Sequence, residues 1–275
     1  MTASALPKLS TATLSLSLPG VAFITGGSSG LGAGAALAFA DLGAKIAVAD
    51  INTKLGEETV AKINGTYPGV AIFVRCDVSQ EADIEAAIAQ TVAAFGRIDY
   101  AINAAGIVVA GDKVTLIKDT DASVFDRTQN IDARGVFLCM KHQIRQMETQ
   151  DVPAGRPRAS RGVIVNLASR ASLEGVSKFG SYCSAKHAVL GMSRVAAVEC
   201  APNQIRVVAM CPGLVKSPGH VEAAKEVDDF LLTTVPMGRF GVVEEITDGL
   251  IFLCSDMASF LTGNAFEIDG GCAAR

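Results

Sequence analysis

The feature that most constrains this sequence is a regular alternation of short apolar runs and longer helical patterns. An apolar run at residues 21–25 precedes an alanine-rich helical stretch, and a second run at 45–49 precedes another helical pattern. The alternation continues, with strands expected at 70–74, 98–103, 162–167, 205–210 and 265–268 and helices at 80–95, 122–147, 182–200 and 244–253. Strand–helix alternation implies right-handed crossovers between parallel strands. It predicts an α/β fold, a doubly wound parallel sheet with helices on both faces.

Length and composition agree with a single domain. The chain has 275 residues, of which 49% are hydrophobic, a high share that parallel strands apolar on both faces explain. No apolar run approaches the ~20 residues that cross a bilayer, so we expect no membrane partner. We predict a flexible tail at residues 1–18 and one domain at 19–275. Two prolines and mixed charge at about 214–240 predict a substrate lid.

Charge and cysteine usage exclude several classes of protein. The net charge is −4 and no basic patch is present, so we expect no nucleic-acid partner. The seven cysteines are scattered and never form a CxxC pair, which favours reduced thiols in a cytoplasmic protein. The histidines lack metal-ligand spacing, and we expect no metal site.

A glycine-rich loop follows the first predicted strand, as in Rossmann-like folds. Glycines allow the backbone to approach a pyrophosphate, and the start of the next helix offers unpaired N–H groups and a positive dipole. A plain strand–helix turn is the alternative, but the place of the loop after the very first strand disfavours it. We therefore expect a dinucleotide to contact Gly26, Ser28, Ser29, Gly30, Leu31 and Gly32.

The end of the second strand carries Asp50, twenty residues after Gly30. A carboxylate at this place can accept hydrogen bonds from an adenosine ribose and repels a 2′-phosphate. The next residue, Ile51, brings no cation and is expected to contact the cofactor. We therefore favour NAD(H), with NADP(H) as the alternative because Lys54 lies nearby. A helix N-cap is a second interpretation of Asp50, compatible with ribose binding.

One of the three tyrosines, Tyr182, has a lysine four residues later, Lys186. On a helix these positions share a face. A free phenol has a pKa near ~10, and a neighbouring ammonium and an oxidised nicotinamide both favour the phenolate. Lowering such a pKa by ~3 requires about 4 kcal/mol. The pair is thus a candidate general acid–base, although such pairs also occur on helix surfaces.

These motifs resemble those of the short-chain dehydrogenase/reductase superfamily, and the resemblance covers about residues 21–271. Residues 25–32 resemble its TGxxxGxG loop, and 103–106 resemble its NNAG motif with Ala104 replacing the second asparagine. Ser169 lies thirteen residues before Tyr182, which is the family spacing. Ser217 replaces the threonine of the family's PGxxxT turn. The resemblance adds these expected cofactor contacts: Asp77, Val78, Asn103, Ala104, Ala105, Gly106, Tyr182, Lys186, Pro212, Gly213, Val215 and Ser217.

The resemblance implies an NAD(P)-dependent oxidoreductase that transfers a hydride between nicotinamide and a ketone or secondary alcohol. It implies that Ser169 holds the substrate oxygen, that Tyr182 exchanges a proton with it, and that Lys186 assists Tyr182 and holds the nicotinamide ribose. Asn130 resembles the asparagine that kinks the fourth helix and holds a relay water. The alternatives are an isomerase or dehydratase-like activity, and a non-catalytic dinucleotide-binding regulator, which the complete set of Ser169, Tyr182 and Lys186 disfavours.

The substrate depends on loops that no sequence rule interprets, at 107–125, 150–161 and 217–240. Apolar residues at 107–109 and 230–232 favour a bulky, hydrophobic ketone or alcohol. The chain is similar to fungal members of the family, many of which act in secondary metabolism. Family members are usually homodimers or homotetramers, which predicts subunit contacts through the helices at 122–147 and 182–200.

Overall fold

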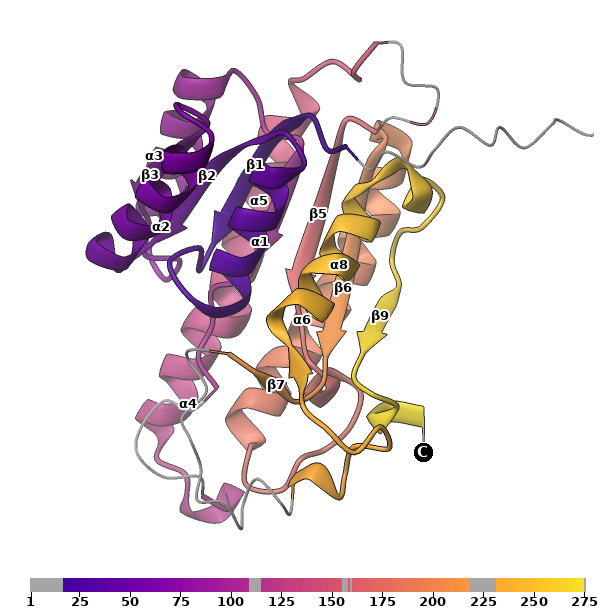
Figure 1. Ribbon diagram of the computed structural model, residues 1–275. Coiled ribbons are helices and arrows are strands. Elements are labelled where there is room, and N and C mark those ends of the chain that lie inside the picture. The colour runs from indigo at the N-terminus through magenta and orange to yellow at the C-terminus, as the bar shows by residue number, and fades with distance from the viewer. Residues whose placement is uncertain (1–16, 109–114, 155–157, 159, 218–230, 275) are drawn as a thin grey trace, which may run out of the picture.

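Seven parallel strands form one sheet in the computed structural model, which describes residues 17–108, 115–154, 158, 160–217 and 231–274 (Figure 1). The strand order is β3-β2-β1-β4-β5-β6-β9. The strands are β1 (Gly20–Thr25), β2 (Ala44–Asp50), β3 (Ala71–Arg75), β4 (Tyr100–Asn103), β5 (Gly162–Leu167), β6 (Ile205–Pro212) and β9 (Ala265–Ile268). The predicted doubly wound parallel sheet is confirmed.

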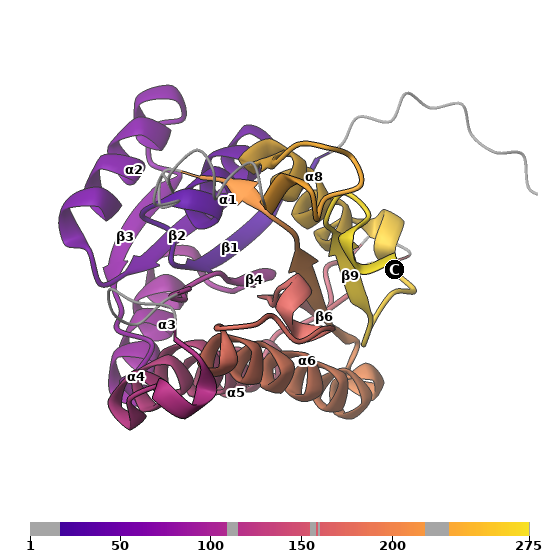
Figure 2. The same cartoon turned by 90° about the horizontal axis from the view of Figure 1, so that it is seen from below.

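Helices cover both faces of the sheet (Figure 2). On one face lie α1 (Gly30–Asp41), α2 (Thr53–Thr66) and α8 (Val243–Cys254), and on the other lie α3 (Glu81–Phe95), α5 (Val136–Glu148) and α6 (Gly180–Cys200). Each face has its own hydrophobic cluster. Phe23 and Ile24 of β1 are both fully buried and belong to opposite clusters, which explains why this strand is apolar throughout.

The strand order places a crevice at one edge of the sheet. Successive strands run outward from β1 to β3 and then in the other direction from β4 to β9, so the order reverses between β1 and β4. The loops that leave these two strands diverge at their carboxyl ends, which is where ligands bind in open α/β sheets. This edge lies at the bottom of Figure 1, beside α4 (Ala122–Thr128) and β7 (Val215–Lys216).

The helix predicted at 122–147 is not a uniform α-helix. A π-helical segment, η2 (Gln129–Gly135), lies between α4 and α5. The pair formed by β7 and β8 (Gly241–Val242) was not predicted, and it joins the two ends of the predicted lid. The middle of that lid, residues 218–230, lies outside the described residues. The remaining elements are the 3₁₀ turns η1 (Ile117–Asp119), η3 (Arg170–Ser172), η4 (Ala201–Asn203), η5 (Asp256–Ala258) and η6 (Cys272–Ala274).

Two sequence-based expectations need correction. Leu18 was assigned to the flexible tail, but its side chain is fully buried and its N–H donates to the carbonyl of Leu42 at 2.9 Å. The domain therefore includes it, whereas residues 1–16 lie outside the described part. The loop at 150–161 was expected to shape the substrate site. Its Gln150 amide instead bonds the backbone N–H and C=O of Ile98, each at 2.8 Å, just before β4.

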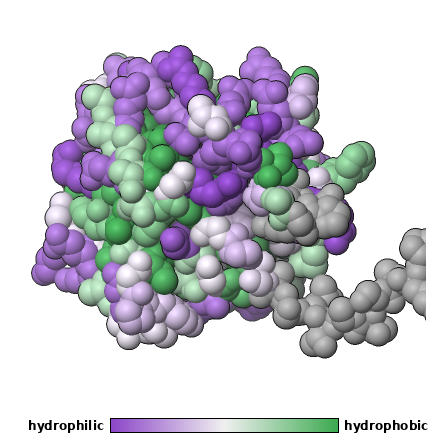
Figure 3. Space-filling view, turned by 90° about the horizontal axis from the view of Figure 1, so that it is seen from above, coloured by the Kyte–Doolittle hydropathy of each residue, from purple (hydrophilic) through white to green (hydrophobic). Residues whose placement is uncertain are grey.

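This contact places the described part of the loop at the amino ends of the strands, far from the crevice. The reason is topological, because the loop precedes β5 and parallel strands begin at the same edge. Figure 3 views this end of the molecule, where hydrophilic residues surround hydrophobic ones.

All seven cysteines are buried and unbonded to one another. Burial raises the pKa of the Cys76 and Cys254 thiols to about 12 and that of Cys200 to about 11. No group of three potential metal ligands occurs among the described residues. Within the same residues, none of the helices is long and apolar enough to cross a membrane.

Candidate active site

The glycine loop packs so closely that side chains are excluded at two points. Gly26 has a φ of +68°, and a Cβ there would lie 2.7 Å from the backbone nitrogen of Ala105. A Cβ on Gly32 would lie 2.1 Å from the carbonyl oxygen of Gly26. The loop thus forms a cradle bounded by backbone atoms. Ser29 precedes α1 without making a side-chain cap, and the first turn of α1 has no acidic residue. The helix start therefore suits the phosphates of a dinucleotide.

The carboxylate of Asp50 lies against this cradle. One oxygen accepts the N–H of Ser28 at 3.1 Å and the other that of Asn52 at 2.9 Å. Asn52, and not Asp50, caps α2, because its side chain accepts the N–H of Leu55. A carboxylate oxygen has two lone pairs, so each retains capacity for a ribose hydroxyl. Ile51 is 58% exposed at the same strand end.

The loops after β3 and β4 form the next part of the crevice wall. Asp77 accepts the N–H and the hydroxyl of Ser79 through one oxygen, and Val78 is buried against Gly135. The backbone N–H of Ala104 donates to the carbonyl of Thr25 at 3.2 Å, which ties the loop after β4 to the glycine loop. Residues predicted from both loops therefore meet at one edge.

The side chain of Asn103 points away from this wall. Asn103 is 1% exposed, and its amide donates to Gln143 at 2.9 Å and to Asn166 at 2.8 Å. Its oxygen accepts from Gln143 at 2.7 Å. Both N–H groups are used inside the protein, so this side chain is not free to donate a hydrogen bond to a cofactor. Its amide links β4 to α5 and β5 and so holds the start of the loop after β4 in place.

The turn after β6 closes the crevice from the other side. Pro212 ends the strand, and the N–H of Gly213 donates to the carbonyl of Ile268 at 3.0 Å. Beyond Val215 in β7, Ser217 approaches Gly30, since a Cβ on that glycine would lie 3.7 Å from the Ser217 hydroxyl. The loops after β1 and β6 therefore face each other, and the residues present fit a nicotinamide dinucleotide.

Ser169, Tyr182 and Lys186 lie on consecutive elements at the same edge. Ser169 follows β5, and its hydroxyl accepts the N–H of Ala171 at 3.1 Å. Tyr182 is the third residue of α6. Lys186, only 5% exposed, donates to the carbonyl of Leu167 at 2.9 Å, and its Nζ lies 5.5 Å from the centre of the Tyr182 ring. The structure thus brings the ring and the ammonium to one face of α6.

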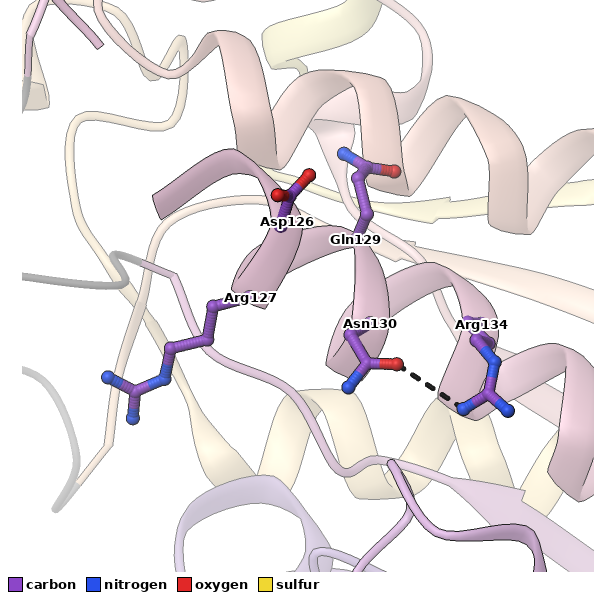
Figure 4. A pocket seen from close by; sticks show the side chains of 5 residues that line it. All are labelled: Asp126, Arg127, Gln129, Asn130 and Arg134. Atoms are coloured by element: carbon purple, nitrogen blue, oxygen red, sulfur yellow. Dashed lines mark hydrogen bonds between the residues drawn. The ribbon is translucent and has the colours of Figure 1, made fainter. Parts of the chain in front are cut away.

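Asn130, the fourth expected catalytic residue, is not brought to Lys186. Its oxygen accepts from the Arg134 guanidinium at 3.3 Å, and both side chains line an open pocket of about 540 Å³ with residues of α4 (Figure 4). The residue that contacts Lys186 is Asp132, whose Oδ2 lies 3.7 Å from Nζ. Two residues on, a helical side chain points to a different side of the axis, so Asn130 and Asp132 have different neighbours.

A sequence signal for Asp132 did exist. It lies four and eight residues before the buried Val136 and Met140, so the helical period places a carboxyl on an apolar face. Charged side chains are rarely buried without a partner. A carboxyl at such a position therefore indicates a buried pair, here with Lys186.

A doubly wound sheet with a glycine cradle at its switch point and a tyrosine–lysine pair beside it defines a dinucleotide-dependent oxidoreductase. The chain belongs to the short-chain dehydrogenase/reductase family: the family model described as Enoyl-(Acyl carrier protein) reductase matches residues 26–273. It is an NAD(P)-dependent oxidoreductase acting on an alcohol or ketone.

Two curated relatives show the range of similarity. The chain is 40% identical over 254 residues to a 2,5-dichloro-2,5-cyclohexadiene-1,4-diol dehydrogenase of Sphingobium indicum, with 91% of this chain and 96% of the relative covered. It is 38% identical over 270 residues to the short-chain dehydrogenase fogB of Aspergillus ruber, covering 93% and 97%. Among solved structures, levodione reductase superposes with a TM-score of 0.84 at 32% identity, covering 94% of this chain and 99% of that one.

Proposed function

We propose that this protein interconverts a bulky hydrophobic secondary alcohol and its ketone with NAD(H), with Tyr182 as the general acid–base. The observation that carries the proposal is the buried ammonium of Lys186 at 5.5 Å from the Tyr182 ring, at the crevice where the dinucleotide cradle ends. Bound nicotinamide supplies the hydride acceptor or donor.

The protein groups handle the oxygen and its proton. The hydroxyl of Ser169 donates a hydrogen bond to the substrate oxygen, and that of Tyr182 gives up a proton when a ketone is reduced or takes one when an alcohol is oxidised. Lys186 is fixed by the carbonyl of Leu167 at 2.9 Å, so its positive charge stays beside the phenol without entering the reaction.

The described residues around Tyr182 support a hydrophobic substrate. Ile117 is 80% exposed, and its Cγ1 lies 2.8 Å from where a Cβ on Gly180 would be, two residues before Tyr182. Leu116, next to Ile117 in the chain, and Val108, in the loop after β4, are also exposed, by 46% and 59%. An apolar ligand that binds here would cover exposed apolar side chains next to the polar catalytic pair, and this burial of apolar surface would favour its binding.

The environment of Asp50 supports NAD(H) over NADP(H). The N–H groups of Ser28 and Asn52 hold the carboxylate in place at the end of β2. Its negative charge repels a 2′-phosphate, whereas its free lone pairs suit ribose hydroxyls. NADP(H) would require a cation to offset that repulsion, and Lys54, at the start of α2, is the nearest candidate along the chain.

The proposal also covers the assembly of the protein, its location and the roles of its less regular segments. We infer a homodimer or homotetramer in the cytoplasm, formed through α5 and α6, since Val195 and Val198 of α6 are 57% and 77% exposed. Similarity to a fungal short-chain dehydrogenase supports a role in secondary metabolism. Residues 1–16 are proposed to be a flexible tail, residues from about 214 to 240 a substrate lid, and nucleic acid is not an expected partner.

A nicotinamide-linked screen of hydrophobic ketones and alcohols tests the proposal, with NADH and NADPH compared for each substrate. We expect NADH to be preferred, and Tyr182→Phe to lower kcat by about 10²–10⁴-fold with little change in cofactor affinity. Ser184→Ala, an exposed position on the same helix, is the matched control. Full activity of Tyr182→Phe would refute the role of the phenol, and a tenfold preference for NADPH would refute that of Asp50.

A further inference from the structure

The loop that joins β3 to α3, residues 76–80, borders the crevice beside Asp50. β2 and β3 are neighbours, Asp50 pairs in register with Arg75, and the N–H of Cys76 donates to the carbonyl of Asp50 at 2.9 Å. A dinucleotide whose adenosine ribose meets Asp50 would therefore have its adenine next to this loop. The place of the loop in the crevice thus bears on how well the adenosine half of the cofactor fits.

Part of the shape of this loop comes from its own residues. Asp77 accepts the N–H and the hydroxyl of Ser79 at 2.9 and 2.7 Å, and its carbonyl accepts the N–H of Gln80 at 2.9 Å. The N–H of Asp77 donates to the carboxylate of Asp83 in α3 at 3.1 Å. These bonds join the loop to itself and to α3, so they do not set its distance from the helices that line the other side of the crevice.

Two consecutive residues of η2 hold the loop against that helical segment. Gly135 allows the backbones to approach, since a Cβ there would lie 3.0 Å from Cγ2 of Val78 and 3.1 Å from its carbonyl oxygen. The guanidinium of Arg134 donates to the carbonyl of Ser79 at 2.8 Å. A hydrogen bond from a charged donor is stronger than one between neutral groups. The loop is therefore fixed by a directed contact as well as by packing.

The guanidinium of Arg134 is oriented by its own helical segment. The amide oxygen of Asn130, four residues earlier, accepts from Arg134 at 3.3 Å, and both side chains line the open pocket of Figure 4. Arg127 lines the same pocket, but its side chain extends away from them and makes no hydrogen bond or ion pair with the part of the chain that the structure describes. Of these two arginines, Arg134 is the one that reaches the loop after β3.

We propose that Arg134 is a positioning residue for the adenosine half of the cofactor: through the carbonyl of Ser79 it fixes the loop that carries Asp77 and Val78. Asn130 supports this role by orienting the guanidinium. A loop that is fixed before the ligand arrives does not have to be ordered when the ligand binds, and this raises affinity. The inference rests on the proposed function, because it requires a dinucleotide in the crevice.

Two simpler roles of Arg134 can be separated from this one. A guanidinium can attract the phosphates of the cofactor through its charge alone, and Arg127→Gln removes the same charge from the same pocket. Arg134 could also stabilise the fold in general, but α3 has a second attachment, because Lys141 and His142 of α5 contact Glu81 at 2.6 and 2.8 Å. Arg134→Gln is therefore expected to fold and to melt close to the unaltered protein.

Titration calorimetry with NADH and with ADP-ribose, which lacks the nicotinamide, tests the inference. We expect Arg134→Gln to weaken the binding of both ligands by the same factor, about three- to tenfold, with kcat at saturating NADH unchanged. Arg134→Lys keeps the charge and a donor for the carbonyl of Ser79, and it should recover part of the affinity. Arg127→Gln should bind both ligands as the unaltered protein does.

The outcomes separate this inference from the proposed function. If the unaltered protein binds NADH and Arg134→Gln binds it equally well, or if Arg127→Gln weakens binding as much, the inference is refuted and the proposed function stands. A lower melting temperature together with losses of both affinity and kcat would show general support of the fold, and would likewise overturn the inference. If Tyr182→Phe retains full activity, the proposed function fails whatever Arg134 does.

Discussion

The cradle at the head of α1 gives a prediction with a calculable size. A Cβ on Gly32 would lie 2.1 Å from the Gly26 carbonyl oxygen and 2.7 Å from its carbonyl carbon. Ordinary contacts are 3.4 Å or longer, so Gly32→Ala requires a displacement of more than 1 Å. Gly26 has little room to move away, because it packs against the backbone of Ala104 and Ala105. Overpacking of this kind costs about 1–3 kcal/mol.

The two consequences can be measured separately. For a chain of this size each kcal/mol lowers the melting temperature by about 2 °C, so Gly32→Ala is expected to melt about 2–6 °C lower. The displaced loop also loses its fit to the pyrophosphate, so NADH should bind at least about tenfold more weakly, equal to about 1.4 kcal/mol. Thermal denaturation monitored by circular dichroism and titration calorimetry with NADH provide the two readouts.

The matched control is Gly65→Ala in α2, where a Cβ meets nothing within 4 Å. Alanine is favoured over glycine in a helix by up to about 1 kcal/mol, so this variant should melt slightly higher and bind NADH normally. If Gly32→Ala matched the control in both measurements, the description of the cradle as a space bounded by backbone atoms would be wrong.

Two further predictions concern the substrate wall and acid stability. Ile117→Ala, beside Gly180, should raise the KM for hydrophobic substrates several-fold with kcat less affected, and an unchanged KM would remove Ile117 from the substrate wall. Lys141 and His142 lower the pKa of Glu81 to about 2, so this carboxylate stabilises the fold above its ordinary pKa of 4.5 and that contribution is lost as the pH falls toward 2. The melting temperature of Glu81→Gln should therefore fall less steeply on acidification over this range, and parallel curves would contradict it.

Strand and helix positions were predictable because the physics that determines them is local. Apolar runs such as residues 21–25 are buried from both faces, and no other element suits such a run between helices. The β7–β8 pair was not predicted, because each strand has two residues, which is too few to show a hydrophobic period. The π-helical segment was not predicted, because its backbone hydrogen bonds span one residue more than those of an α-helix and this change leaves no mark in the amino-acid composition.

Site residues were predictable to the extent that their neighbours lie close along the chain. Tyr182 and Lys186 are four apart on one helix, so their shared face follows from helical geometry. The environment of Asn103 did not follow, because its partners Gln143 and Asn166 lie 40 and 63 residues away. Asn130 was predicted because it resembles the family's asparagine, and Asp132 was not considered. Which side of a helix faces the site depends on the helical phase, and the π-helical segment changes that phase here.

The burial of every cysteine has a practical consequence for spectroscopy. Thiols are attacked as thiolates, and the chain's own thiols are both covered by packed side chains and, at Cys76 and Cys254, held protonated far above neutral pH. A cysteine introduced at an exposed position such as Ser184 would outcompete them for a maleimide dye. A fluorophore placed there, two residues from the catalytic phenol, would report the arrival of ligands at the crevice without removal of any native cysteine.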